Sequence, residues 1–163
     1  MRKVALAVVS VLTLAGCSSI DCAFNSKVIS NYAMYDGNDN MVALGYYLTV
    51  STPRVSDGQD TTLINLQGNV SSVSLPMSYA QDVDELHFIL SDSTYAAVAS
   101  DVVYVSKTNE PVFESVDCTP RYNHTILGVS STHAFIDTVI VNNNKVTNDT
   151  TQVHFHIRLR SSL

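Results

Sequence analysis

The alternation of apolar and polar residues is the feature of this sequence that most constrains its fold, and it is clearest in VHFHIRLR at residues 153–160. Successive side chains of a β-strand point to opposite faces, so a period of two predicts a strand with one buried face. The apolar face would carry Val153, Phe155, Ile157 and Leu159, and the solvated face would carry His154, His156, Arg158 and Arg160.

Similar runs, rich in β-branched and aromatic residues, recur along the chain with polar turns about every 8 to 12 residues. The Asp-Gly pair at residues 36–37 predicts a hairpin between the first two runs. Single helical turns are expected only at residues 77–86 or 95–99. The sequence predicts an all-β domain, an antiparallel β-sandwich of immunoglobulin-like or related Greek-key type, with a small barrel as the alternative. The further strands are expected at residues 26–35, 41–51, 61–66, 70–75, 86–90, 102–106, 112–116, 122–129 and 133–143.

The N-terminus has the layout of an export signal, with Arg2 and Lys3 before the apolar run VALAVVSVLTLA. This run is shorter than the roughly 20 apolar residues that a membrane-spanning helix needs. It ends in LAGC, at residues 14–17, which resembles the lipobox of bacterial lipoprotein precursors. The resemblance implies that Cys17 receives a diacylglyceryl group, that residues 1–16 are removed and that the new amine is acylated. An ordinary secretion signal, with an incidental Cys17, is the alternative.

A lipid on Cys17 would decide where the protein resides, because two or three acyl chains, such as palmitate, hold a protein on a membrane far more durably than one. We expect residues 17–25 to form the lipidated N-terminus and a short tether, and residues 26–163 to form the β-domain. Ser18 resembles the pattern that sends lipoproteins outward. The expected location is therefore the bacterial cell envelope, at the outer membrane, on its periplasmic or its external side.

The other two cysteines, Cys22 and Cys118, leave an even pair in an exported chain. An even pair favours a disulfide, because the bacterial envelope permits oxidation. The bond would close a loop of about 97 residues and stabilise the fold by up to about 4.7 kcal/mol. Two separately buried thiols are the alternative.

The charge of the chain argues against nucleic-acid partners. The chain has 9 basic and 15 acidic residues, a net charge of −6 with neutral histidines. Loss of Arg2 and Lys3 with the signal leaves 7 basic and 15 acidic residues, a net charge of −8. Nucleic-acid binding normally requires a basic stripe, and this chain has no run of Lys or Arg.

The histidines are the first candidates for chemistry. His154 and His156 would project from one strand face, a spacing that some zinc and copper sites use. A metal site would need a third ligand from His87, His124 or His133. Cationic Arg158 and Arg160 on the same face oppose a second cation. We therefore expect histidines on a solvated strand face, and no metal or other cofactor.

Acidic and nucleophilic motifs give no stronger signal. Asp36, Asn38 and Asn40 resemble the start of a calcium loop, but the later EF-hand positions hold Met41 and Tyr47, so a turn is expected. The acidic cluster at Asp82, Asp84 and Glu85 is interpreted as an exposed loop rather than as paired catalytic carboxylates. The sequence has no G-x-S-x-G, phosphate-binding or dinucleotide motif, so no enzyme is predicted.

The second half of the chain raises a family resemblance. It contains the Asp-Cys pair at residues 117–118 and the closing segment IDTVIVNNN at residues 136–144, with Cys22 and the lipobox near the start. These features resemble a family of short lipoproteins from Gram-negative gut bacteria that is described only as a domain of unknown function. The resemblance implies a β-type envelope lipoprotein and no particular activity.

Two functions remain open from the sequence. We favour a lipid-anchored binding or assembly module that contacts an envelope protein or a glycan. A sheet edge, to which residues 153–160 could contribute, would accept a partner strand. The alternative is a small metal-dependent or glycan-acting enzyme that uses His154, His156 and a carboxylate in a pocket.

Overall fold

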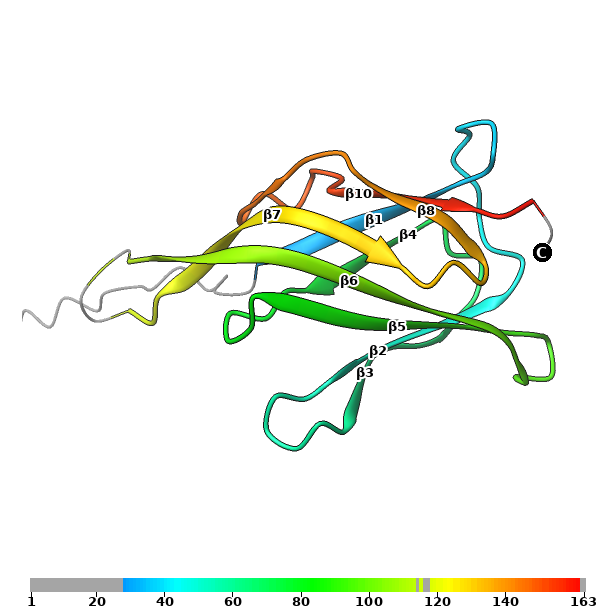
Figure 1. Cartoon of the computed structure of the whole chain (residues 1–163), viewed down its shortest axis with the longest axis horizontal. Coiled ribbons are helices and arrows are strands. Elements are labelled where there is room, and N and C mark those ends of the chain that lie inside the picture. The colour runs from blue at the N-terminus through cyan, green and yellow to red at the C-terminus, as the bar shows by residue number, and fades with distance from the viewer. Residues whose placement is uncertain (1–27, 114, 116–117, 162–163) are drawn as a thin grey trace, which may run out of the picture.

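The computed structural model describes residues 28–113, 115 and 118–161, and these residues form strands, turns and loops. Alternating residues in these strands bury one side of each sheet, which is the pattern that the sequence predicted (Figure 1). The strands are β1 (Ile29–Tyr35), β2 (Tyr47–Pro53), β3 (Asp60–Gln67), β4 (Ser72–Pro76), β5 (Val83–Ser91), β6 (Ala97–Val112), β7 (Arg121–Ser131), β8 (Ile136–Val141), β9 (Lys145–Val146) and β10 (Phe155–Leu159).

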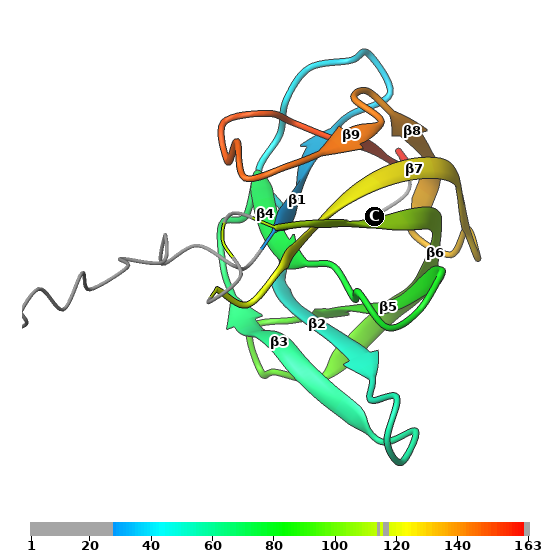
Figure 2. The ribbon, with the colours of Figure 1, turned by 90° about the vertical axis from the view of Figure 1, so that its left-hand side faces the viewer.

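The strands form two sheets that pack as a sandwich (Figure 2). The smaller sheet has the order β4-β1-β10-β8, and the larger sheet has the order β3-β2-β5-β6-β7-β9. All pairings within these sheets are antiparallel except that of β1 with β10, which places Tyr32 opposite Phe155. The predicted all-β sandwich in a single domain is confirmed, and the two sheets do not close into the alternative small barrel.

The core lies between the sheets and is rich in aromatic contacts. The ring of Tyr32 stacks on that of Phe155 within the smaller sheet, with centroids 4.5 Å apart and planes at 13°. It also meets Phe88 of the larger sheet edge-on, at 6.2 Å and 61°. Such pairs add stabilisation beyond the burial of their area, so these rings help to fix how the two sheets face each other.

The C-terminal segment is a strand, as predicted, but its surroundings differ from the prediction. β10 lies between β1 and β8, so both of its edges are paired and it offers none to a partner. The prediction that His154 lies on a solvated face is wrong, because His154 precedes the strand and is fully buried. The Arg158 guanidinium does reach the surface, where it pairs with Asp39 at 2.6 Å.

The predicted helical turns are wrong, and the predicted hairpin at Asp36 forms only in part. The residues expected to be helical turns or separate strands between 95 and 112 belong largely to one long strand, β6, and residues 83–86 belong to β5 rather than to a helical turn. The Asp36 carboxylate does form the expected turn, since Oδ1 accepts the N–H groups of Asn38 and Asn40 at 2.8 and 2.9 Å. An antiparallel bridge of Tyr35 with Met41 closes this turn, but the chain then crosses to the other sheet, so the predicted hairpin is limited to that bridge and does not join β1 to β2.

The connection between β7 and β8 is held by a buried carboxylate, that of Asp101 in β6. It accepts hydrogen bonds from the Thr132 hydroxyl at 2.6 Å and from the N–H groups of Ala134, Phe135 and Ile136 at 2.6, 2.7 and 2.7 Å. Burial alone would raise the pKa of this carboxyl, but the four hydrogen bonds outweigh burial and leave the pKa below its ordinary value.

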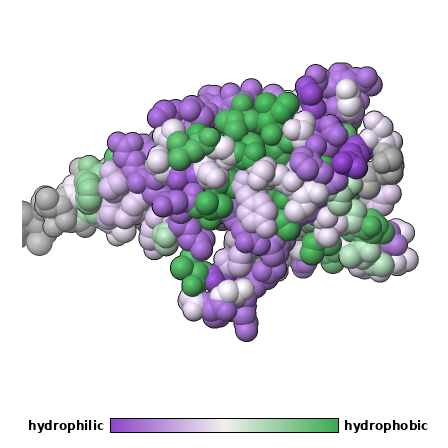
Figure 3. All heavy atoms as spheres, in the orientation of Figure 1, coloured by the Kyte–Doolittle hydropathy of each residue, from purple (hydrophilic) through white to green (hydrophobic). Residues whose placement is uncertain are grey.

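The predictions for the export signal, for lipidated Cys17 and for Cys22 concern residues 1–27, which lie outside the described residues. These predictions therefore remain predictions. None of the described elements is a helix of the length and hydropathy needed to cross a bilayer. On the face seen in Figure 3, hydrophobic side chains gather over the upper middle of the molecule. Separately, Leu127 of β7 is 68% exposed.

Candidate ligand pocket at one end of the sandwich

A pocket of about 430 Å³ opens at the end of the sandwich where β1 begins and β7 starts. This is the left-hand end in Figure 1. Apart from Thr119 and His124, its lining side chains are apolar or aromatic. The volume lies within the range of about 300 to 1,000 Å³ that is typical of small-molecule sites. The lining residues are Val28, Pro76, Met77, Tyr79, Thr119, Pro120, Tyr122 and His124.

His124 is a buried polar residue in the lining of the pocket. Its Nδ1 lies 2.8 Å from the Asn109 side-chain oxygen, and the Asn109 amide nitrogen donates to the Gln81 carbonyl at 2.9 Å. The amide oxygen can only accept, so this arrangement assigns the proton to Nδ1 of His124 and leaves Nε2 as an acceptor. Burial, together with the positive charge of Lys107, lowers the pKa of His124 to about 4. The imidazole is therefore neutral at physiological pH.

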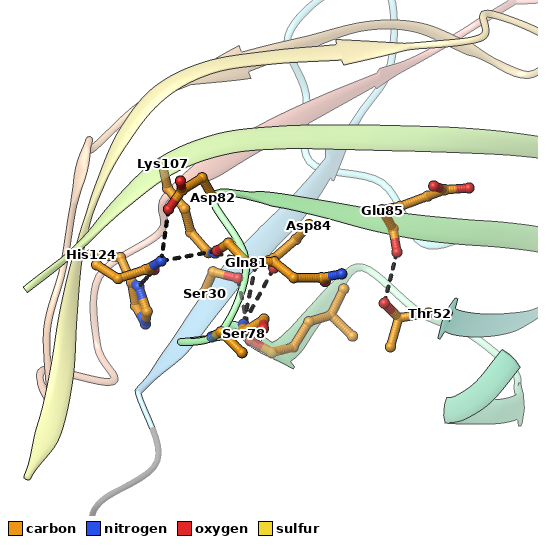
Figure 4. Close-up of polar contacts among 12 residues, drawn as sticks. Ser30, Thr52, Ser78, Gln81, Asp82, Asp84, Glu85, Lys107 and His124 are labelled. Atoms are coloured by element: carbon orange, nitrogen blue, oxygen red, sulfur yellow. Dashed lines mark hydrogen bonds and ion pairs between the residues drawn. The ribbon is translucent and has the colours of Figure 1, made fainter. Parts of the chain in front are cut away.

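A buried ion pair lies beside this histidine (Figure 4). The Lys107 side chain has no exposed area; its Nζ lies 3.2 Å from Oδ1 of Asp84 and also donates to the Gln81 carbonyl. Asp84 accepts the Ser78 N–H at 3.3 Å as well. Burial raises the pKa of Asp84, against the attraction of Lys107. Each charge is thus matched by the other inside the fold, and neither faces the pocket.

Exposed aromatic side chains lie at the same end of the sandwich as the pocket, and Tyr79 and Tyr122 line it. Tyr79, in the loop before β5, is 65% exposed and stacks on Tyr122 of β7, with centroids 5.0 Å apart and planes at 17°. Phe113, immediately after β6, is 70% exposed. A tyrosine side chain combines an apolar ring with a polar hydroxyl, so this pair adds both kinds of surface to the lining.

The hydrogen-bond partner of His124 is consistent with a neutral imidazole. A carboxylate partner would instead stabilise its charged form. The partner of His124 is an amide, and the low pKa disfavours the charged form. The lining therefore combines a largely apolar surface with the imidazole acceptor of His124 and the hydroxyl-bearing side chains of Thr119, Tyr79 and Tyr122.

The two histidines that the sequence singled out do not form a site. His154 is buried, its pKa is lowered by burial, and its Nδ1 accepts the Asn31 N–H at 3.1 Å. His156 instead packs against Tyr35, with ring centroids 4.4 Å apart. Within the part of the chain that the structure describes, no group of three or more His, Cys, Asp or Glu residues is placed to hold a metal ion.

The acidic cluster is also distributed differently from the prediction. Asp84 is buried in β5, whereas Glu85 faces outward. On that outer face His87 bridges two carboxylates, with Nε2 2.8 Å from Glu85 and Nδ1 3.0 Å from Asp60. The hydrogen bond to Glu85 raises the pKa of His87 against the effect of burial, and Asp60 adds to the rise.

Sequence reasoning missed Lys107 and treated His124 only as a possible third metal ligand. A signal for Lys107 was present, because it continues the inward-facing positions of Val103 and Val105 in β6. A lysine at a core position of an alternating strand is a buried charge that needs a partner. For the predicted disulfide, Cys22 lies outside the described residues, so its pairing with Cys118 remains a prediction.

The model of one known protein family matches most of this chain. The model of a family of unknown function, DUF6452, matches residues 47–159. The chain belongs to this family. The matched segment of the DUF6452 protein includes Lys107, His124 and β10, but not Val28 at the pocket wall. No curated protein and no solved structure matches the DUF6452 chain significantly. The prediction of an uncharacterised family is thus confirmed, and the family brings no activity with it.

Proposed function

We propose that this DUF6452 protein is an envelope lipoprotein that is anchored through acyl chains on Cys17 and acts as a binding module, with the end pocket as its ligand site. The observation that carries the proposal is an apolar pocket of about 430 Å³ whose neighbouring charges are matched within the fold. Pockets of this kind, with a few converging polar groups, are the default ligand sites of proteins.

The position of the pocket supports its connection with the anchor. Val28 at the pocket wall follows Cys17 by only eleven positions in the sequence. Thr119 and Pro120, also at the wall, directly follow Cys118, the predicted partner of Cys22. The tether would therefore leave the domain beside the pocket, and the ligand would be an envelope component. The outer membrane of a Gram-negative bacterium is the proposed location.

No observation favours the enzyme alternative. It required His154 and His156 to gather with a carboxylate in a pocket. The first is enclosed in the fold and the second packs on Tyr35, while the pocket is lined by other residues.

The anchor is tested by expression of the full chain in a Gram-negative host, with Cys17→Ser as the matched variant. We expect the wild-type protein to partition into detergent and to carry the mass of its acyl chains. The Cys17→Ser protein should lose both properties. Equal partitioning of the two proteins would refute the anchor.

The ligand site is tested separately, by photo-cross-linking in native envelopes. A benzophenone amino acid at exposed position 119, in the pocket wall, should capture a reproducible envelope component. The same group at Thr62, an exposed position on β3, is the control. Identical products from the two positions would refute the pocket as the ligand site.

A further inference from the structure

We propose that the end pocket binds an acyl chain of a membrane phospholipid from the bilayer to which the protein is tethered. This inference rests on the proposed function, since it names the ligand class of the same site. The case depends on the lining of the pocket, on its charge and on its position relative to the membrane.

The lining of the pocket suits a hydrocarbon chain. Val28, Met77 and Pro120 provide aliphatic surface, and Tyr79 and Tyr122 provide aromatic surface. A ligand rich in hydrogen-bonding groups would lose its contacts with water here and regain few of them, which is costly. The polar groups of the lining are few: the acceptor of His124 and the hydroxyls of Thr119, Tyr79 and Tyr122.

The charge around the pocket decides which part of a lipid enters. The Lys107 ammonium group is engaged by Asp84 and by the Gln81 carbonyl, so it does not offer a counter-charge to a carboxylate or phosphate. His124 is neutral, because burial lowers its pKa to about 4. A charged headgroup would therefore remain in water at the mouth, while the tail occupies the pocket.

The position of the pocket points to the bilayer as the source. An extended chain spans at most about 3.6 Å per residue, so the eleven positions from Cys17 to Val28 keep the pocket within about 40 Å of the lipidated residue. The same end of the sandwich exposes Tyr79 and Phe113. Tyrosine is enriched at the interface between lipid and water, and an exposed phenylalanine adds apolar surface.

The proposal is tested with the mature chain carrying Cys17→Ser, which has no acyl chain of its own, and with the lipidated wild-type chain. The ligand is pyrene-labelled phosphatidylcholine in vesicles of dioleoylphosphatidylcholine. The loss of pyrene excimer fluorescence monitors the transfer of lipid to the protein, and native mass spectrometry gives the mass of the complex. We expect both chains to take up one lipid molecule per protein.

Two variants of one exposed residue in the pocket wall make the result specific. Thr119→Trp should fill the mouth and Thr119→Glu should place a charge there, and each should weaken lipid binding at least about tenfold. Thr62→Trp on β3 should bind like the parent. Circular dichroism of all three variants controls for folding.

Several outcomes would overturn the inference. They are the absence of saturable lipid uptake by either chain, or equal uptake by the Thr119 variants and the parent. Uptake by the Cys17→Ser chain but not by the lipidated chain would assign the pocket to the protein's own acyl chain instead. The proposed function would survive each of these results if the detergent partitioning and the cross-linking at position 119 gave their expected outcomes.

Discussion

The buried pair of Lys107 and Asp84 allows a prediction whose size follows from the structure. Lys107→Met removes the ammonium group while it keeps a side chain of similar length in the core. Asp84, which is 5% exposed, then retains the Ser78 N–H as a hydrogen-bond donor but has lost its counter-ion. The Gln81 carbonyl keeps the amide of Asn109 as a donor.

The expected loss of stability is about 3 to 5 kcal/mol, the cost of removing one partner of a buried ion pair. Stabilities of single domains are about 5 to 15 kcal/mol, so this one change removes a large fraction. The double variant Asp84→Leu/Lys107→Met buries no charge and replaces the pair with apolar volume. We expect it to lie within about 1 to 2 kcal/mol of the wild type, because exchange of a buried pair for apolar residues is often nearly neutral.

The measurement is equilibrium unfolding in urea of the wild type, of the single variants Lys107→Met and Asp84→Leu, and of the double variant. The double-mutant cycle of these four proteins gives the coupling free energy between the two side chains.

The pH dependence of these stabilities adds an internal check. Burial raises the pKa of Asp84, so the folded state binds its proton more readily than the unfolded state does. The penalty of Lys107→Met should therefore shrink as the pH falls toward the pKa of Asp84.

Two results would refute this reasoning. A loss below about 1 kcal/mol for Lys107→Met would mean that Asp84 is not left as an uncompensated buried charge. A double variant as unstable as the single one would mean that Lys107 stabilises the fold through contacts other than its pair with Asp84.

Three further predictions concern other parts of the fold. Asp101→Asn should destabilise the domain by about 2 to 4 kcal/mol in urea unfolding, since an amide cannot accept from all the converging donors. The folded state lowers the pKa of Asp101, so the stabilisation that its carboxylate provides should be present above the unfolded pKa of about 3.9. This stabilisation should be lost as the pH falls through the folded pKa. His87 has a raised pKa in the folded state, so the stabilisation that it provides should be complete below the unfolded pKa of about 6.5 and be lost as the pH rises through the folded pKa. His87→Gln should remove this pH dependence from the free energy of unfolding. Alkylation of the mature protein without reductant should label neither Cys22 nor Cys118, and reduction should lower the free energy of unfolding by at most about 4.7 kcal/mol; two labelled cysteines before reduction would contradict the disulfide.

Local pattern in the sequence was sufficient for the class of fold. The period of two in Phe155 to Leu159 predicted a strand because a pleated backbone itself turns alternate side chains to opposite faces. Turn chemistry at Asp36 was predicted correctly for a similar reason, since its carboxylate bonds to N–H groups only two and four residues away. Both features depend on neighbours in the sequence.

The candidate site could not be predicted in this way. Val28, Met77 and the β7 residues Tyr122 and His124 come from three separate stretches of the chain, and nothing in any one stretch indicates that the others lie beside it. Lys107 was detectable as a charge at an inward position of β6, but its partner Asp84 was assigned to an exposed loop.

The sequence by itself determined that the chain forms half-buried strands and carries a net negative charge, because these properties belong to short segments or to composition. Only the tertiary structure decided that β10 pairs in parallel with β1, with Phe155 opposite Tyr32, and that His154 is enclosed in the fold. Pairing between such distant strands is set by how whole faces bury their apolar area together, and local alternation is compatible with many such arrangements. The pocket and its neutral His124 arise from that arrangement, which is why they emerged only with the assembled sandwich.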